Sequence, residues 1–264
     1  MTLDRGFTLV EMIVVIAITA VIASAVAVFI RRPVEGYVDA ARRAELTDIA
    51  DTALRRMTRD LRSALPNSIR TTSNASGAYL EYLQTSGGGR YRAQTDSGGL
   101  GDPLNFAAAD STFDVIGTIP TFAGGESIAI YNLASSGGTA NAYLGDNRAA
   151  FSSTSASGIN LTAPKLFPFT SPGKRFHVVQ YAVTYRCDTA TGELRRYWSY
   201  GIVDPQPAPP ATANNALLAT NVNGCTFSYT SVTQRVGVVA LNLQVSKAGE
   251  TVRLFQQVHI NNVP

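Results

Sequence analysis

The chain has 264 residues, of which 45% are hydrophobic and 16% are charged. This length allows one sizeable folded domain behind a membrane segment, or at most two small ones. The 22 lysines and arginines outnumber the 19 acidic residues only slightly, for a net charge of +3. Such an excess does not indicate nucleic acid or anionic lipid as a partner, and we expect no nucleic-acid partner.

An apolar segment occupies residues 7–30, where the non-apolar side chains are Thr8, Glu11, Thr19 and Ser24. A helix of this length, at about 1.5 Å per residue, crosses the hydrocarbon core of a bilayer. Arg5 lies on the short N-terminal flank, and by the positive-inside rule it favours placement of the rest of the chain outside the cytosol.

Secretory signal peptides offer an alternative interpretation of this segment. Ala-x-Ala cleavage patterns occur at residues 23–25 and 25–27, but they lie inside an apolar run that continues to Ile30. A signal peptide has only about 7–15 apolar residues before its cleavage site. The sequence therefore favours a retained membrane helix, with cleavage by signal peptidase as the alternative.

Glu11 is the one charged side chain of the apolar segment. A carboxylate inside an apolar span costs roughly 2.5–3.5 kcal/mol on insertion scales. In a generic membrane anchor, Glu11 would lie near the start of the helix and stay solvated at the interface. Otherwise it needs a partner of opposite charge.

The string from Gly6 to Glu11, GFTLVE, followed by the apolar helix, resembles the N-terminal signal of type IV pilins and of the pseudopilins of type II secretion. The resemblance implies that prepilin peptidase cuts after Gly6 and methylates the new amino terminus at Phe7. It also implies that Glu11 pairs with the Phe7 amine of a neighbouring subunit. Because both charges would be desolvated together, this pairing would set the register between subunits.

The amphipathic pattern that follows covers residues 33–65. Its apolar positions recur mostly every three or four residues, which predicts a helix with one packed face. They are Val38, Leu46, Ile49, Ala50, Ala53, Leu54, Met57, Leu61 and Leu65. Pro33 either kinks a continuing helix or begins a new one, and Pro66 ends it. A coiled coil is the alternative, but the stripe lacks a clean heptad.

Beyond residue 66 the chain predicts a β-rich domain that extends to residue 264, so the fold class is α+β with a long N-terminal helix and an antiparallel β-rich domain. Two hairpins have the strongest pattern: residues 175–186 with 193–203, and residues 234–246 with 251–260. Between the hairpins, the proline-rich stretch 204–213 predicts an extended loop.

The first part of this domain has a weaker pattern. Residues 79–83 and 91–93 flank the triplet Gly87-Gly88-Gly89 and predict a loose hairpin. Residues 95–109 and 134–158 predict long loops. The glycines lack the Lys-Ser/Thr ending of a phosphate-binding loop and are interpreted as loop glycines.

Cys187 and Cys225 are the only cysteines. In an exported domain the oxidising compartment favours a disulfide between them over two separate buried thiols. Neither His177 nor His259 has metal-ligand spacing to the cysteines, so we expect no metal site there. The loop acids Asp96, Asp102, Asp110 and Asp114 lack EF-hand spacing and are interpreted as solvated side chains.

Catalytic motifs are absent from the sequence, which has no Gly-x-Ser-x-Gly, no His-Glu-x-x-His and no Cys-x-x-Cys. We therefore predict a protein that is not an enzyme, with no catalytic residues and no cofactor. The strand aromatics form either a sugar-stacking surface or cross-strand core pairs. These residues are Tyr181, Tyr185, Tyr197, Trp198 and Tyr200.

Residues 37–68 and 255–264, with the region around Cys187, also resemble MshO-like minor pilins of mannose-sensitive haemagglutinin (MSHA) type IV pilus biogenesis. This resemblance implies a leader peptide over 1–6, a transmembrane and filament-core helix over 7–32, an amphipathic helix over 33–65 and an extracytoplasmic domain over 66–264. It implies a subunit at or near the pilus tip that primes assembly. Its partners would be prepilin peptidase, other minor and major pilins and the inner-membrane assembly platform.

The implied location is the bacterial inner membrane, as a single-pass protein with its C-terminal domain in the periplasm, and afterwards the pilus at the cell surface. Two alternatives share the N-terminal features. One is a minor pseudopilin of type II secretion, and the other is a pilus-mounted adhesin that binds sugar.

Overall fold

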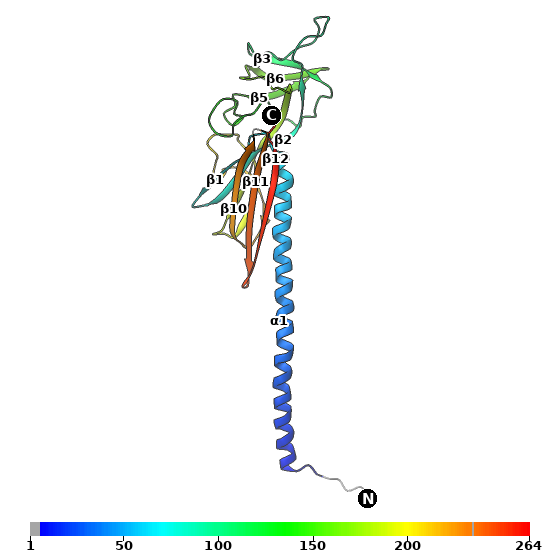
Figure 1. The fold of residues 1–264 in the computed structure, drawn as a ribbon, viewed down its shortest axis with the longest axis vertical. Helices are drawn as coiled ribbons and strands as arrows, with labels where there is room; N and C mark the ends of the chain where they lie inside the picture. Colours follow the sequence, from blue (N-terminus) through cyan, green and yellow to red (C-terminus); the bar gives the residue numbers. More distant parts are fainter. Residues whose placement is uncertain (1–5, 234) are drawn as a thin grey trace.

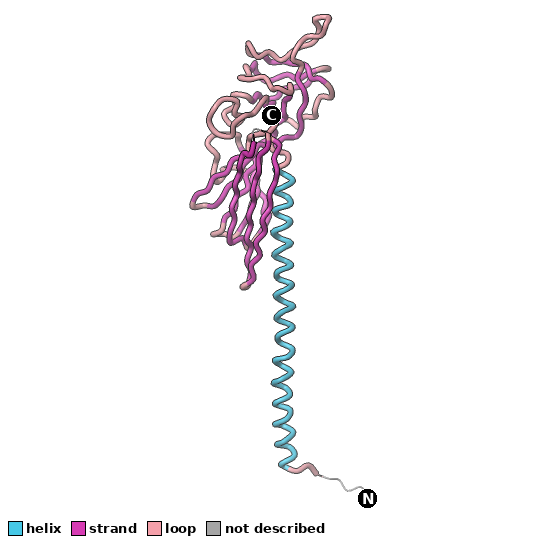
Figure 2. The backbone as a smooth tube through the Cα atoms, viewed as in Figure 1, coloured by secondary structure: helices cyan, strands magenta, loops and turns pink. Residues whose placement is uncertain are grey.

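The computed structural model describes residues 6–233 and 235–264 (Figures 1 and 2). It has an α+β, type IV pilin-like architecture: one long N-terminal helix carries a C-terminal domain of antiparallel strands. This agrees with the fold class expected from the sequence. Most of the leader, including Arg5, lies outside the described residues, as does Gln234 at the start of the last predicted hairpin.

The helix α1 (Leu9–Leu61) has 53 residues and is therefore about 80 Å long. It continues through Pro33 without a break, so of the two alternatives for this proline the structure shows a continuing helix. The N-terminal part of α1 projects away from the β-rich domain, whereas its C-terminal part lies along that domain (Figure 1).

One face of the C-terminal part of α1 is buried. Its members are Leu46, Ala50, Ala53, Leu54, Met57 and Leu61. Their spacing of mostly three and four residues places them on one side of the helix, as the sequence predicted. The helix ends at Leu61 and not at Leu65, although Leu65 is also fully buried.

The described part of the β-rich domain contains twelve strands. They are β1 (Arg70–Asn74), β2 (Gly77–Tyr91), β3 (Asp110–Ile116), β4 (Ser127–Ala129), β5 (Arg148–Thr154), β6 (Gly158–Lys165), β7 (Arg175–Asp188), β8 (Glu193–Tyr200), β9 (Asn214–Ala219), β10 (Val222–Thr233), β11 (Val236–Lys247) and β12 (Glu250–Asn261).

Nine strands form one sheet in the order β1-β2-β3-β6-β5-β4-β7-β8-β9, and β2 also pairs with β7. The extra pairing closes the six strands β2, β3, β6, β5, β4 and β7 into a ring, which we call the distal ring. Its interior holds a separate apolar cluster that includes Phe113, Phe167 and Phe176. The labelled ring strands β3, β5 and β6 lie at the end of the molecule farthest from the N-terminus (Figure 1).

The remaining strands β10, β11 and β12 form a second antiparallel sheet that packs against α1. The larger apolar core lies between α1, this sheet and apolar side chains of β2, β7 and β8, such as Leu80, Tyr185 and Leu194. The hairpins β7–β8 and β11–β12 confirm the two strongest predictions, with Gln234 outside the described residues. Residues 204–213 contain no strand, as expected.

The hairpin predicted around Gly87-Gly88-Gly89 is wrong. The triplet lies inside the single strand β2, which pairs with β7 along almost its whole length. A Cβ atom at Gly88 would lie 2.6 Å from the carbonyl oxygen of Phe176, and one at Gly89 would lie 2.8 Å from the Phe176 ring. These glycines therefore allow close packing of two strands and do not form a turn.

The long loop predicted over residues 134–158 is wrong in part, because it contains β5. This strand pairs with β4 and β6. The sequence of β5 has no clear strand pattern, and it is the pairing with these two neighbours that stabilises it as a strand. Residues 95–109 contain no strand, in agreement with the predicted loop.

Candidate processing and assembly site

The bond between Gly6 and Phe7 lies in irregular chain just before α1. Both residues are exposed, and the Phe7 side chain is 75% exposed. A peptidase needs an extended and accessible backbone at the bond that it cuts, and a bond inside a helix would first have to unfold. The structure therefore leaves the predicted cleavage position open to an enzyme. Cleavage and methylation themselves stay predictions.

Thr8 caps the N-terminus of α1. Its backbone is extended (φ −81°, ψ 151°), and its Oγ1 accepts a hydrogen bond from the backbone N–H of Glu11 at 3.2 Å. Its carbonyl accepts a second bond from the N–H of Met12. Such a cap satisfies N–H groups that the first helical turn leaves without partners. The Thr-x-x-Glu spacing is that of a capping box, a signal that the sequence analysis overlooked.

Glu11 lies in the first turn of α1 and is exposed. Its position near the positive end of the helix dipole favours a carboxylate. Among the described residues, its carboxylate has no hydrogen-bond or ion-pair partner. The side chain of Glu11 is therefore available to a group outside the described chain.

The other internal polar groups of the apolar segment are satisfied by the helix itself. The Thr19 hydroxyl donates to the carbonyl of Val15 at 2.7 Å, and the Ser24 hydroxyl donates to the carbonyl of Val21 at 2.8 Å. Hydroxyl groups bonded in this way are tolerated in an apolar environment. Glu11 is thus the exception in a segment that otherwise suits lipid or a helix bundle.

Among the described residues, α1 is the one helix that is long and apolar enough to cross a membrane. Its most apolar 18-residue window has a mean hydropathy of 3.0, and none of this window is buried in the protein. Directly beyond the apolar segment, Arg31 forms an ion pair with Glu35 at 2.8 Å. The segment is therefore fully exposed to whatever surrounds it and ends at a charged boundary.

A pair of ion pairs holds the turn of the β11–β12 hairpin to α1. Glu250 accepts two hydrogen bonds from the Arg43 guanidinium, at 2.6 and 3.3 Å. Lys247 donates to Glu45 at 2.7 Å. We call these four residues the clasp. The two pairs have opposite polarity: in one the helix supplies the cation, and in the other the helix supplies the anion. This alternation of charge favours the observed alignment of the helix with the hairpin turn over one in which like charges meet.

Asp60 fixes the other end of the packed helix. It accepts a hydrogen bond from the Tyr185 hydroxyl at 2.7 Å and from the Arg196 guanidinium at 2.9 Å. The side chains of Asp60 and Arg196 are only 11% and 10% exposed. Burial raises the pKa of Tyr185 far above its ordinary value, so this hydroxyl remains a donor to Asp60.

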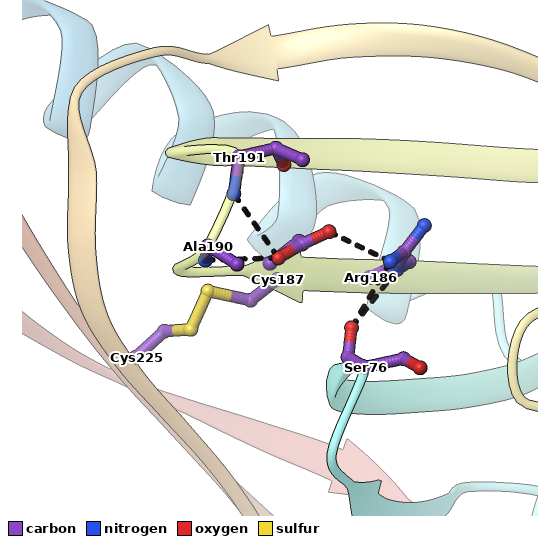
Figure 3. The surroundings of a disulfide bond; sticks show 7 residues. Ser76, Arg186, Cys187, Ala190, Thr191 and Cys225 are labelled. Carbon is purple, nitrogen blue, oxygen red and sulfur yellow. Dashed lines mark hydrogen bonds and ion pairs between the residues drawn. A yellow bond between two sulfur atoms is a disulfide. The ribbon is translucent and has the colours of Figure 1, made fainter.

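The disulfide joins Cys187, at the end of β7, to Cys225 in β10 (Figure 3). It connects the nine-stranded sheet to the three-stranded sheet. Beside it, Asp188 accepts hydrogen bonds from the N–H groups of Ala190 and Thr191 in the β7–β8 turn and pairs with Arg186. Burial opposes ionisation of Asp188, but these partners together lower its pKa.

A buried polar network connects β1, β2 and the proline-rich loop. Arg70 contacts Glu81 at 2.6 Å and Asp204 at 2.8 Å. Glu81 is fully buried and also accepts hydrogen bonds from the hydroxyls of Tyr200 and Thr184. Burial raises the pKa of Glu81, while Arg70 and the hydroxyls act in the opposite direction. Every partner is used within the fold, so the network is structural.

The strand aromatics do not form an exposed stacking surface. Tyr185 is fully buried, and Tyr200 is 8% exposed and donates to Glu81. Tyr181, Tyr197 and Trp198 are partly buried and pack against the apolar clusters. Of the two interpretations, core packing is therefore the one that the structure shows for these five residues.

The interpretation of the four acids as solvated loop side chains is wrong in part: Asp110 and Asp114 lie in β3, and Asp114 is buried and pairs with Arg92. Asp96 accepts N–H groups of its own turn, and Asp110 does the same for Asn105. Asp102 accepts the hydroxyl of Thr112, and Asp114 accepts that of Ser157. Within residues 6–233 and 235–264, no group of three or more His, Cys, Asp or Glu side chains is placed to hold a metal ion.

In comparison with protein-family models, residues 1–27 match the prokaryotic N-terminal methylation motif. Comparisons with curated proteins and with solved structures gave no match. The matched motif contains Gly6, Phe7 and Glu11 and continues into the apolar helix. Together with the long exposed helix and the β-rich domain, it supports a type IV pilin-like protein, a structural subunit that is a substrate of prepilin peptidase.

Proposed function

We propose that this chain is a minor pilin of an MSHA-type type IV pilus that enters the filament at or near its tip and primes assembly. Prepilin peptidase removes the leader 1–6 and methylates Phe7. Residues 7–32 then form the filament-core helix, residues 33–65 connect it to the surface, and residues 66–264 form the outer domain.

The single observation that carries this proposal is the carboxylate of Glu11, which has no partner within residues 6–233 and 235–264, on a helix whose other internal polar groups are satisfied. In lipid or in a filament core, an isolated carboxylate is costly. The new amino terminus at Phe7 supplies a positive charge that a neighbouring subunit can bring to Glu11. Pairing of the two charges offsets the cost and fixes the axial register of the subunits.

Membrane orientation follows from this assignment and not from flanking charge. Arg31 and Arg32 lie on the C-terminal side of the apolar segment, and Arg5 lies on the other. Counted over both flanks, the positive-inside rule therefore does not support the orientation that Arg5 alone favours. A pilin-type leader requires its cleavage site at the cytoplasmic face, which places the β-rich domain in the periplasm before assembly and on the pilus surface afterwards.

The size of the β-rich domain supports a position at or near the tip. The distal ring adds a second apolar cluster beyond the one that packs on α1. Such a bulky domain would crowd a helical shaft of closely packed subunits. The partners in this proposal are other minor and major pilins and the inner-membrane assembly platform, which drives extraction of the helix from the membrane.

A minor pseudopilin of type II secretion is the competing function, because it would share the leader, the helix and the β-rich domain. The two differ in output. Deletion of the gene in its host abolishes surface fibres if the protein belongs to a pilus, and abolishes protein secretion with fibres intact if it belongs to a secretion system.

The experiment that tests the shared part of the proposal is expression of the full chain with and without a prepilin peptidase, followed by intact mass measurement and N-terminal sequencing. We expect a chain that begins with methylated Phe7 only when the peptidase is present. Gly6→Val should remain uncut. A wild-type chain that still begins at Met1 in the presence of the active peptidase would overturn the proposal in favour of a simple membrane anchor.

A further inference from the structure

A hollow of about 490 Å³ lies on the distal ring where β2 and β7 run side by side. It is lined by the end of β2 from Thr85 to Arg90 and by Arg175, Phe176 and His177 of β7. A hollow of this volume falls in the range of small-ligand sites. Neither the processing site nor the clasp uses any of these residues.

The glycine triplet contributes to this hollow. Along β2, Ser86, Gly88 and Arg90 are exposed and alternate with less exposed residues, so these three lie on the outer face. In the register of the two strands, Gly88 is opposite His177 and Arg90 is opposite Arg175. Gly88 places no side chain between the imidazole and the two arginines, and a Cβ atom there would lie 2.6 Å from the Phe176 carbonyl oxygen.

Arg90 and Arg175 form a like-charged cross-strand pair. Both side chains are exposed, and neither takes part in an ion pair within the described chain. Like charges directly opposite each other in an antiparallel pair are destabilising. Two guanidinium groups that share one face are, however, well suited to hold an oxyanion, because each can donate two parallel hydrogen bonds.

His177 adds a neutral polar group to the lining. Its Nε2 atom is buried and has no hydrogen-bond partner among the described residues. Burial, followed by the charge of Arg175, lowers the pKa of His177 to about 4. The imidazole is therefore neutral at ordinary pH and adds no charge to the lining.

The carboxylate that contacts this lining is already occupied. Glu126 is buried and accepts hydrogen bonds from the Ser86 hydroxyl at 2.9 Å and from the N–H of Ala123 at 2.8 Å. The exposed charge of the hollow therefore comes from the two arginines and is positive.

A second hollow, of about 760 Å³, shares Arg175 with the first. It is lined also by Tyr131, Arg235 and Leu133, among others. Arg175 thus stands between two adjoining depressions on the surface. This arrangement suits a chain-like ligand, which can run from one hollow to the other, better than a single small ion.

We propose that this surface binds an acidic polysaccharide, with a carboxylate or sulfate group of the sugar chain held between the guanidinium groups of Arg90 and Arg175. Sugar units occupy the glycine-lined hollow and continue past Arg175 into the second. Nucleic acid fits less well, because its affinity comes from many phosphate contacts and this site offers few cations. The proposal does not depend on which filament the protein enters.

The test measures binding of the full chain in detergent micelles to dextran sulfate, polygalacturonate, neutral dextran, sodium sulfate and single-stranded oligothymidine. We expect the two acidic polysaccharides to bind and dextran not to bind. The double variant Arg90→Gln/Arg175→Gln should weaken this binding by about tenfold or more, because two charge-assisted contacts are lost. Arg175→Lys should weaken binding less, because lysine keeps the positive charge but cannot donate two parallel hydrogen bonds as a guanidinium does.

Arg253→Gln is the matched control. Arg253 is exposed on β12, lies on the other sheet and has no ion-pair partner in the described chain. Its replacement removes the same charge and should leave binding unchanged. The Arg90 and Arg175 variants should melt no lower than the wild type, because they relieve a like-charge pair.

Equal binding by the wild type and the double variant would overturn the proposal, as would an equal loss in Arg253→Gln. Sodium sulfate bound as tightly as the polymers would identify a free anion as the ligand, and oligothymidine bound more tightly would identify nucleic acid. Either result would overturn the assignment to a polysaccharide.

Discussion

Arg43 and Glu250 are 207 positions apart in the sequence, yet the guanidinium of one meets the carboxylate of the other at 2.6 Å. The second pair of the clasp, Glu45 with Lys247, spans a separation of 202 positions. The clasp therefore binds the turn of the last hairpin to the part of α1 that lies just outside the buried helix face.

Charge reversal tests the clasp. Arg43→Glu should release the hairpin turn, because Glu250 then faces a carboxylate and the second pair alone holds the turn. Hydrogen exchange of the full chain in detergent should show faster exchange of the amides around residues 246–251. The double variant Arg43→Glu/Glu250→Arg should restore protection. Because exposed ion pairs are screened, the difference should shrink at high salt.

The control for this test is Arg55→Glu, since Arg55 pairs with Asp51 on the helix itself. It should leave exchange of the hairpin turn unchanged. If Arg43→Glu also leaves the turn protected, the apolar contacts of β11 and β12 with α1 are sufficient to hold the hairpin, and the clasp has no role in docking.

Removal of the disulfide should destabilise the β-rich domain without unfolding it. The bond closes a loop with a sequence separation of 38 residues, which corresponds to about 4 kcal/mol in the loop-entropy model. Cys187→Ser/Cys225→Ser should therefore lower the urea midpoint of the full chain, while α1 still joins both sheets through the common core. The oxidised wild type should migrate faster than the reduced protein on a gel.

Two results would contradict this prediction. The first is equal mobility with and without reductant, with both thiols open to labelling. The second is a double variant as stable as the wild type. In either case the common core with α1 and the packing of β10 against β1, β2 and β7 would hold the two sheets together without help from a disulfide.

Features with a local pattern were predictable from the sequence. The buried face of α1 follows from apolar residues such as Leu46, Ala50 and Met57 at helical spacing. The β7–β8 hairpin follows from two apolar runs around a turn that ends in Gly192, which adopts a positive φ of 70°. The motif from Gly6 to Glu11 can likewise be identified from its own residues and the apolar segment that follows it.

Features that depend on distant residues were not predictable in this way. The distal ring closes through the pairing of β2 with β7. Gly88 lies in a strand because the backbone of Phe176 comes too close there for a side chain, and this contact cannot be read from the residues around Gly88. The strand β5 depends on its neighbours β4 and β6. The clasp joins residues more than 200 positions apart, and neither of its halves carries a recognisable motif.

His177 should make the stability of the chain sensitive to pH. Its ordinary pKa is about 6.5, and burial lowers it to about 4 in the folded protein. Between these values the unfolded chain binds a proton that the folded chain does not. The free energy of unfolding should therefore fall by about 2 kcal/mol on acidification from about pH 7 to about pH 5.

The variant His177→Gln should lose this part of the pH dependence, and urea unfolding of the full chain at both pH values measures it. His259→Gln is the control, because His259 is exposed on β12 and is solvated in both states. Equal pH dependence in the wild type and in His177→Gln would show that His177 can take up its proton within the folded protein.

Replacement of Glu11 separates processing from assembly. Glu11→Gln retains the size of the side chain and the cap of Thr8, which uses the backbone of residue 11. Cleavage after Gly6 should therefore proceed normally. Incorporation into filaments should fail, because the charged amine of Phe7 would lose its partner, and an unpaired buried charge costs about 3–5 kcal/mol. Filament fractions probed with an antibody, together with the mass of the cell-associated chain, measure both steps.

Thr19→Val is the matched control for Glu11→Gln. It changes one polar side chain in the same apolar segment, but the Thr19 hydroxyl bonds only to carbonyls of its own helix. It should be processed and incorporated like the wild type. If Glu11→Gln is incorporated equally well, subunit register cannot depend on a charge pair at this position. The exposed carboxylate would then be a solvated residue at the start of a membrane helix.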